Sequence, residues 1–250
     1  MRPFWVALST LTLIPIPTAN PSPDDLKRSV IFFPLVGVLL GLVFFGLHQI
    51  PLAADLQALV ILLCWVGLTG AFHLDGLGDC LDGFFGGRTP QDRQRIMKAA
   101  NLGTYGMAGI TLTLIAKYVL LNHLLLQERS GLGIFQNSSA LWLIAIPTAA
   151  RWGVSFACFI AKAPAGNQGL GSQLMGVSPL ILFLSTLLGL VGCIALKGDG
   201  LTILGLAAGI AWGVSRLSQS RIGGLTGDGM GMMIELTEVG ALLAACLLHP

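Results

Sequence analysis

Long apolar stretches recur along this 250-residue sequence, and they restrict its fold more than any other feature. A helix needs roughly 20 predominantly apolar residues to cross the hydrocarbon core of a bilayer. The stretches that approach this length are Val30–Leu47, Leu56–Phe72, Gly106–Leu126, Ala140–Ala161, Pro179–Leu196, Leu201–Ser215 and Gly229–Leu248. None alternates apolar and polar residues as a membrane β-strand does. The sequence therefore predicts an all-α, polytopic transmembrane helix bundle of about seven spans, with six to eight as the range and no β-sheet.

The composition agrees with a lipid environment. Only 10% of the residues are charged, whereas soluble domains carry about 25%. The net charge of +2 comes without a basic run, so we expect no nucleic-acid binding. Because apolar stretches recur without a linker, we expect residues 1–250 to form one integral membrane domain. Whether the protein forms an oligomer is left open.

The basic residues outside the spans predict the orientation. Ten of them fall on one side of the predicted spans and two, Arg129 and Lys197, on the other. The ten are Arg2, Lys27, Arg28, Arg88, Arg93, Arg95, Lys98, Lys162, Arg216 and Arg221. Cytoplasmic loops carry the excess of Lys and Arg. We therefore expect a multi-pass protein of the cell inner (plasma) membrane, with the long loop at residues 73–105 and the loop at residues 216–228 facing the cytoplasm.

The N-terminal segment, residues 1–28, precedes the first clear span. Its apolar run from Phe4 to Ile16 resembles a signal peptide, but Pro15 and Pro17 interrupt it and no clear cleavage site follows. We expect a short interfacial or re-entrant helix, and whether residues 4–16 span the membrane is left open.

The first acidic motif lies in residues 72–88, at the end of an apolar stretch. Asp75, Asp79 and Asp82 are spaced i, i+4 and i+7, so on a helix they share one face. Like charges stacked in this way repel one another unless a cation lies between them. All the donors are oxygens, which favours Mg²⁺. The alternative, a solvated acidic helix end, would normally mix lysines among the acids.

The second acidic motif lies in residues 216–238. Asp228 is surrounded by glycines, including Gly224 and Gly227, and such a segment suits a backbone cradle for phosphate. Glu235 and Glu238 follow inside an apolar stretch, where an acid needs a metal, a basic partner or water.

Lys117 and Arg151 lie near the middle of their apolar stretches and must face the bundle interior or water. They could pair with Glu235 and Glu238, or they could hold an anionic ligand. The sequence leaves both readings open, with a preference for structure at Lys117 and for phosphate contact at Arg151.

Further basic and polar residues flank the acids. His73 opens the first motif and is either a structural hydrogen-bonding group or a base. Arg88, Arg93, Arg95 and Lys98 follow this motif, partly as ordinary cytoplasmic charge and partly as candidates for binding a diphosphate.

With these residues in place, the chain resembles the cobalamin synthase family, the adenosylcobinamide-GDP ribazoletransferases. The most specific matching strings are His-Leu-Asp-Gly-Leu-x-Asp-x-x-Asp-Gly, within Phe72–Gly83, and Gly-Gly-x-Thr-Gly-Asp, within Gly223–Glu238. Other matching pieces are Phe4–Trp5, Leu11–Thr12, Pro15–Pro17, Phe33–Gly37, Ile96–Lys98, Gly103–Gly106, Ala116–Lys117 and Gly169–Gly171. The chain departs from the family at Ala99, Asn101 and Met232, so Ile96–Asn101 cannot be given the family's usual charged contacts.

The resemblance implies a Mg²⁺-dependent phosphotransferase that joins adenosylcobinamide-GDP to α-ribazole, or to its 5′-phosphate, and releases GMP. It implies metal ligation by Asp75, Asp79, Asp82 and Asp228. It also implies catalysis by Asp82, Asp79 and His73, and substrate binding by Arg88, Lys98, Arg151, Gly224, Thr226 and Gly227. Which carboxylate is the base, and which acceptor is used, are left open.

Two other functions remain as alternatives. A cation-coupled transporter would also carry intramembrane acids and a lysine, although its acids should concentrate near the membrane midplane. A CDP-alcohol phosphotransferase would need Ala-Arg at Gly86–Gly87, and Arg88 comes one residue late.

Overall fold

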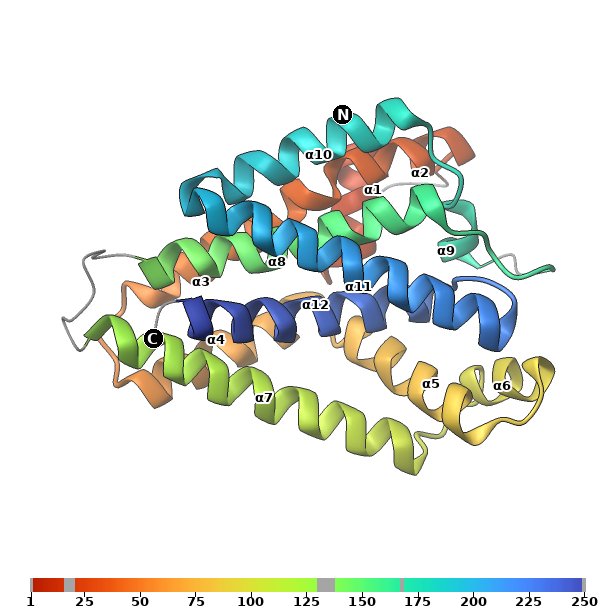
Figure 1. The fold of residues 1–250 in the computed structure, drawn as a ribbon, viewed down its shortest axis with the longest axis horizontal. Coiled ribbons are helices and arrows are strands. Elements are labelled where there is room, and N and C mark those ends of the chain that lie inside the picture. The colour runs from red at the N-terminus through yellow and green to blue at the C-terminus, as the bar shows by residue number, and fades with distance from the viewer. Residues whose placement is uncertain (1, 16–20, 130–137, 167–168, 249–250) are drawn as a thin grey trace.

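The computed structural model of the chain describes residues 2–15, 21–129, 138–166 and 169–248, and within them the only regular secondary structure is helical. Figure 1 shows the helices, which are α1 (Arg2–Leu11), α2 (Pro23–Ser29), η1 (Val30–Phe32), α3 (Phe33–His48), α4 (Ala54–Thr69), α5 (Phe72–Gly86), α6 (Pro90–Met97), α7 (Thr104–Arg129), α8 (Ser138–Ile160), α9 (Leu170–Gln173), α10 (Pro179–Cys193), η2 (Ile194–Leu196), α11 (Gly198–Ile222) and α12 (Gly227–Leu248). Six helical segments are long and apolar enough to cross a membrane, and the bent pair α4–α5 would make a seventh. The prediction of a polytopic all-α bundle is confirmed.

Helices α8 and α12 form the centre of the bundle. Helix α8 packs against α3, α10, α11 and α12, while α12 also packs against α5 and α7. Their most apolar windows are 72% and 61% buried, compared with 22% for α7 and for α10. Polar groups on the two central helices are therefore shielded from lipid, while α7 and α10 present much of their surface to it.

Small residues allow α3 and α8 to approach closely. A Cβ atom added at Gly37 would lie 2.5 Å from the carbonyl oxygen of Pro147, and one added at Gly41 would lie 2.8 Å from that of Leu143. This Gly-x-x-x-Gly spacing is the pattern that lets membrane helices pack backbone to backbone. The contact fixes α8, from which Arg151 projects.

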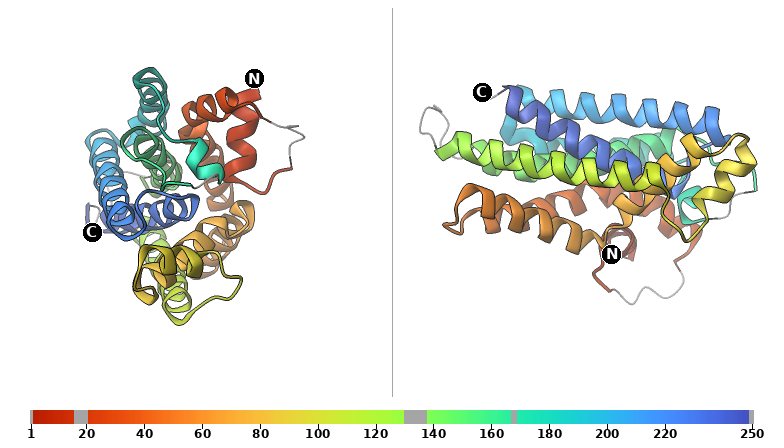
Figure 2. Two further views of the ribbon diagram at one scale, coloured as in Figure 1. Left: turned by 90° about the vertical axis from the view of Figure 1, so that its right-hand side faces the viewer. Right: turned by 90° about the horizontal axis from the view of Figure 1, so that it is seen from below.

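One end of the bundle brings together helices α5, α6 and α9 and the C-terminal end of α11 (Figures 1 and 2). The C-terminus of the chain lies toward the opposite end. Side chains of α6 fasten it to α11, because Arg93 Nη1 donates to the carbonyl of Arg221 at 3.1 Å and Gln94 Nε2 to that of Ile222 at 3.0 Å. These bonds satisfy carbonyls that the end of a helix leaves without partners.

The first acidic motif begins at a sharp break between two helices. Gly70 and Ala71 both adopt left-handed conformations, with φ of 63° and 56°, and α4 and α5 meet at an angle of 81°. Residues 73–105, predicted as one long loop, instead contain α5 and α6. Thr89 is the N-cap of α6, because its hydroxyl accepts a hydrogen bond from the Asp92 amide, and Pro90 is the first residue of the helix.

The N-terminal helix is short, as expected. Helix α1 has 10 residues, which is half of what a spanning helix needs, and it packs against α2 and α3. The expected interfacial segment extends to Ile16, which lies outside the described residues.

Candidate active site

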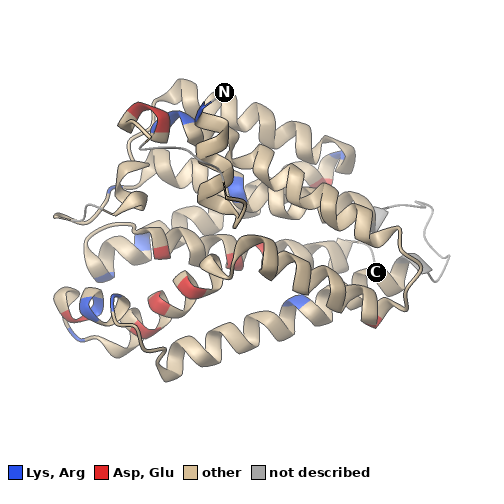
Figure 3. Ribbon diagram, turned by 180° about the vertical axis from the view of Figure 1, so that it is seen from behind, with Lys and Arg blue, Asp and Glu red and all other residues tan. Residues whose placement is uncertain are grey.

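The two acidic motifs meet where α5 crosses α12. A Cβ atom added at Gly76 would lie 2.8 Å from the carbonyl oxygen of Asp228, and one added at Gly231 would lie 3.1 Å from the Cα of His73. The backbones can approach this closely only because glycine has no side chain. Segments about 150 residues apart in sequence are thereby joined, and Figure 3 shows acidic positions running along α5 beside the start of α12.

This contact yields a prediction with a matched control. Gly76→Ala places a methyl group against the backbone of Asp228, so the two motifs must separate. We expect any activity that needs both motifs to fall by up to about 100-fold, because a displacement of about 1 Å can have that effect. Gly205→Ala, on α11, meets no atom within 4 Å and should leave turnover unchanged. Equal effects of the two variants in a turnover assay would contradict the assigned role of this crossing.

The carboxylates of the first motif differ in exposure along α5. Asp75 is exposed, Asp79 is half-buried and Asp82 is buried. Asp79 lies within electrostatic reach of Asp75, Asp82 and Asp228. Within the described residues, no lysine or arginine forms an ion pair with Asp228 or with the three carboxylates of the first motif. The site therefore concentrates negative charge without a protein cation to neutralise it.

Asp82 has a structural partner that the sequence did not predict. Its carboxylate accepts hydrogen bonds from the backbone amides of Gly103 at 2.6 Å and Gly106 at 2.9 Å. Both amides belong to the start of α7, where a carboxylate satisfies free N–H groups and complements the helix dipole. Asp82 thus joins α5 to α7, and its role as a metal ligand or base stays a prediction.

The residues available to a metal ion supply the right chemistry but do not form a closed metal centre. In the described part of the chain, no three His, Cys, Asp or Glu side chains lie close enough together to hold an ion. Asp75, Asp79 and Asp228 nevertheless offer only oxygen donors, which Mg²⁺ prefers, and their charges are uncompensated. The donor set fits a hard divalent cation.

Two cavities are bordered by Asp228. The first, called here the polar cavity, measures about 90 Å³ and is lined by Gln94, Met97, Lys98, Ala165, Gly166, Thr226 and Asp228. The second, called here the large cavity, measures about 280 Å³ and is bordered by His73, Asp75, Gly227 and Asp228 together with apolar side chains. A site with a carboxylate shared by two cavities can bring two molecules together.

Several predicted substrate-binding residues line these cavities. Lys98 and Thr226 line the polar cavity, and Gly227 lines the large one. The Thr226 hydroxyl lies 3.4 Å from Asp228 Oδ2 and accepts from the Gly229 amide at 3.3 Å, so it holds the start of α12 in place.

Arg88 and Gly224 are placed differently. Arg88 is exposed and lines neither cavity. Gly224 packs against the backbone of the segment after α8, where an added Cβ would lie 2.6 Å from the carbonyl oxygen of Lys162. Close packing explains this glycine, so the predicted phosphate cradle narrows to Thr226 and Gly227.

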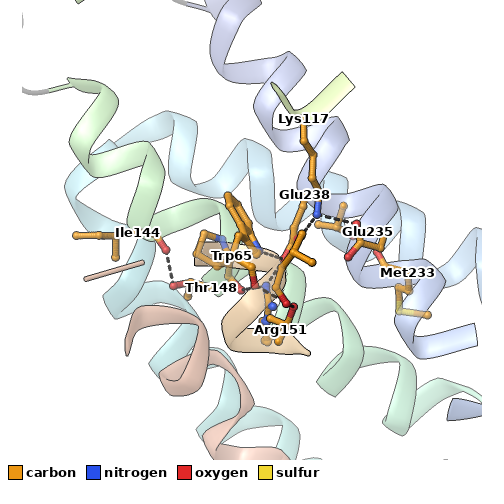
Figure 4. A network of polar contacts seen from close by, with 12 residues as sticks. Trp65, Lys117, Ile144, Thr148, Arg151, Met233, Glu235 and Glu238 are labelled. Atoms are coloured by element: carbon orange, nitrogen blue, oxygen red, sulfur yellow. Dashed lines mark hydrogen bonds and ion pairs between the residues drawn. The ribbon is translucent and has the colours of Figure 1, made fainter. Parts of the chain in front are cut away.

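A buried ion network lies deeper in the bundle (Figure 4). Lys117 Nζ lies 2.6 Å from Glu235 Oε2 and 2.5 Å from Glu238 Oε2, and Arg151 pairs with the other oxygen of Glu238. The Trp65 indole also donates to Glu238, at 3.2 Å. No side chain in these ion pairs is more than 4% exposed. The network joins α4, α7, α8 and α12.

This network corrects the preference for Arg151 as a phosphate contact. Its side chain is 0% exposed, is held by Glu238, and lines neither cavity beside Asp228. The buried carboxylate takes the place of a substrate phosphate, so we assign Arg151 a structural role. Lys117 agrees with the structural reading.

The sequence did not indicate part of the wall of the large cavity. Thr10 and Leu11 of α1, and Leu170 and Leu174 at α9, complete it. The only sequence signal for them was the match to family segments at residues 11–12 and 169–171, which gave no role.

Comparison with known proteins finds relatives along the entire chain. A model of the cobalamin-5-phosphate synthase family matches residues 3–246. The adenosylcobinamide-GDP ribazoletransferase of Pseudomonas entomophila is 35% identical over 99% of this chain and 100% of that protein. The protein of the same name from Desulforamulus reducens is 33% identical over 97% and 95%, respectively. No solved structure matches the chain.

Proposed function

The chain belongs to the cobalamin-5-phosphate synthase family, and on this premise we propose that it joins adenosylcobinamide-GDP to α-ribazole or its 5′-phosphate. The ribose hydroxyl of the acceptor attacks the phosphorus on the cobinamide side of the diphosphate. The bond from this phosphorus to the bridging oxygen breaks, and GMP leaves with that oxygen. The product is adenosylcobalamin or its 5′-phosphate.

The observation that carries this proposal is the shared position of Asp228 between two cavities, beside the first acidic motif. A transfer between two substrates needs both held at one point, and the crossing of α5 and α12 provides that point. A group of four carboxylates, Asp75, Asp79, Asp82 and Asp228, suits a reaction in which a diphosphate arrives with a metal ion.

The two cavities suit different parts of the substrates. We assign the diphosphate to the polar cavity, where the Lys98 ammonium and the Thr226 hydroxyl can bind phosphate oxygens. We assign the acceptor to the large cavity, because its apolar walls suit the aromatic ring system attached to the ribose of α-ribazole. His73 and Asp75 border this cavity. Together with Asp79 they are the candidates to accept the hydroxyl proton.

Asp75, Asp79 and Asp228 are the residues we propose for holding Mg²⁺, with Asp82 supporting them from the α7 contact. The ion, when bound, would neutralise the charge of the diphosphate and of the leaving GMP. An ion held by these carboxylates would lie near both cavities, because Asp228 borders both.

The transporter alternative loses its main support. A cation-coupled transporter would use titratable acids deep in the spans, and the candidates were Glu235 and Glu238. Lys117 and Arg151 neutralise both, so these acids are not free to bind a transported cation.

A direct assay tests the proposed function. Purified protein in lipid receives adenosylcobinamide-GDP, α-ribazole or its 5′-phosphate, and Mg²⁺, and GMP is measured by chromatography. We expect GMP and the cobalamin product in equal amounts, with none formed when the acceptor is omitted. If GMP appears without acceptor, or not at all with either acceptor, the proposed reaction is wrong.

Topology gives a separate prediction. We propose that the protein lies in the plasma membrane with α5 and α6 toward the cytoplasm, because of the excess of basic residues on that side. A cysteine at Thr89 should react with a membrane-impermeant maleimide only after cells are opened, in a background without the native cysteines. A cysteine at Gln49, which is exposed between α3 and α4, should react in intact cells. The reverse pattern would overturn the orientation.

A further inference from the structure

A groove between α8 and α11 has no part in the site described so far. It measures about 520 Å³ and lies between the last turn of α8 and the last third of α11. Its lining includes Phe156, Ile160, Lys162, Trp212, Arg216 and Gln219, none of which borders the cavities beside Asp228. We call it the α8–α11 groove.

The charge of the groove is positive. Lys162 and Arg216 are both exposed, and no acidic residue lines the groove. In the described residues neither cation forms an ion pair with a carboxylate. The Arg216 guanidinium lies 5.7 Å from the centre of the Trp212 ring, so a cation–π contact holds it at the groove. The groove thus offers two cations to an anion.

Most of the remaining lining is apolar, and Ser215 and Gln219 are its polar exceptions. Trp212 is 57% exposed and Ile160 is 38% exposed, and both belong to helices long and apolar enough to cross the membrane. Lys162 follows the end of α8, and this helix end lies on the same side of the bundle as α9 (Figure 1). Tryptophan and basic residues at the ends of membrane helices lie at the level of lipid headgroups. The groove therefore crosses from headgroup to acyl-chain depth.

We propose that the α8–α11 groove binds one anionic phospholipid, with its phosphate between Lys162 and Arg216 and its acyl chains against Phe156, Ile160 and Trp212. Basic pockets between membrane helices on the cytoplasmic side bind anionic lipids in this way. A soluble phosphate would use the two cations but not the exposed apolar wall. A second copy of the chain could neutralise Lys162 and Arg216 only by placing one of its acidic residues in the groove.

The bound lipid would lie next to Lys162, whose backbone contacts the segment that precedes α12. The carbonyl of Lys162 accepts a hydrogen bond from the Leu225 amide at 2.8 Å, and Leu225 precedes Thr226. Lipid binding at this place does not depend on the proposed reaction, so the two proposals can fail separately.

Native mass spectrometry of the full-length protein tests this site. The protein is purified in a mild detergent and titrated with phosphatidylglycerol or, separately, with phosphatidylcholine of the same acyl chains. We expect one phosphatidylglycerol to bind in preference to phosphatidylcholine. Removing one cation, by Lys162→Gln or Arg216→Gln, should weaken it about 5-fold, and removing both about 30-fold, since each basic residue near an anionic lipid contributes a similar increment. Arg28→Gln is the matched control, because Arg28 is an exposed arginine that pairs with Asp24.

The remaining outcomes decide against the proposal. Equal binding of the two lipids, or unchanged phosphatidylglycerol binding in the double variant, would overturn it. Displacement of phosphatidylglycerol by millimolar inorganic phosphate or GMP would assign the cations to a soluble phosphate instead. Loss of a dimer in the double variant, with no change in lipid binding, would assign the groove to a second copy. Thermal unfolding of each variant checks that reduced binding does not come from unfolded protein.

Discussion

Asp79→Asn is expected to lower GMP release by at least about 1000-fold while the protein remains folded in the membrane. Asparagine keeps the shape of the side chain and removes its charge. The Asp79 carboxylate interacts electrostatically with Asp75, Asp82 and Asp228. The substitution therefore removes the most central oxygen donor of the proposed metal site. Folding should not suffer, because the change relieves repulsion among like charges.

The measurement is GMP release at several Mg²⁺ concentrations, with thermal unfolding as the check on folding. Asp92→Asn is the matched control. Asp92 is a nearby acid on α6 that is partly exposed and pairs with Arg95 at 3.2 Å, and a surface pair of this kind contributes at most about 1 kcal/mol. Turnover of the control should stay within about twofold of the unchanged protein. A near-normal rate for Asp79→Asn at low Mg²⁺ would mean that Asp79 is not a metal ligand.

Asp82→Asn is a poorer test of the same site. The two carboxylate oxygens of Asp82 accept hydrogen bonds from the amides of Gly103 and Gly106. The amide side chain of asparagine has only one oxygen that can accept. The variant should therefore lose about 1 kcal/mol of helix capping in addition to any loss of metal binding. The sequence placed Asp82 with Asp75 and Asp79 by spacing alone, and spacing does not reveal that a helix start more than 20 residues onward uses this carboxylate.

The spans could be predicted from the sequence because each depends on local apolar content, which the bilayer selects directly. The break between α4 and α5 could not. Gly70 is a usual residue for a left-handed turn, but Ala71 beside it carries no such signal. The sequence therefore assigned Phe72 to the end of a span, while the structure starts α5 there.

The candidate acids Asp75, Asp79, Asp82 and Asp228 stand out in the sequence because charged residues are rare in this apolar chain and three of them share a helical spacing. Their convergence depends on the crossing of α5 and α12 at Gly76 and Gly231, which is a long-range packing feature. The wall formed by α1 and α9 depends on packing in the same way. A single sequence indicates which residues are unusual, but it does not show which distant residues contact one another in the fold.

The contacts of the buried charges could not be predicted from the sequence either. Lys117, Arg151, Glu235 and Glu238 were identified as needing partners, and their pairing was left open. The structure pairs them unequally, since Glu238 contacts both cations and Trp65, whereas Glu235 forms its ion pair with Lys117. Residue spacing does not predict this inequality, which decides which glutamate must be neutralised when Lys117 is replaced.

Lys117→Met should lower the free energy of unfolding by about 3–5 kcal/mol, because it leaves a buried negative charge unpaired. The two cations and two carboxylates of the network sum to zero charge, and methionine removes one positive charge at nearly constant length. Adding Glu235→Gln restores neutrality and keeps the pair between Arg151 and Glu238 intact. We therefore expect the double variant Lys117→Met with Glu235→Gln to recover most of the lost stability.

Lys117→Met with Glu238→Gln is the matched control, because it has the same net charge but separates the remaining ions. It leaves Arg151 without its carboxylate and Glu235 without its ammonium, so its stability should stay low. Thermal unfolding of the detergent-solubilised single and double variants measures the difference. Equal recovery in both double variants would show that net charge alone matters and that the pairing does not. A Lys117→Met protein that unfolds at the normal temperature but has lost substrate affinity would instead make Lys117 a ligand-binding residue, since a cation that stabilises the fold cannot be removed without lowering its stability.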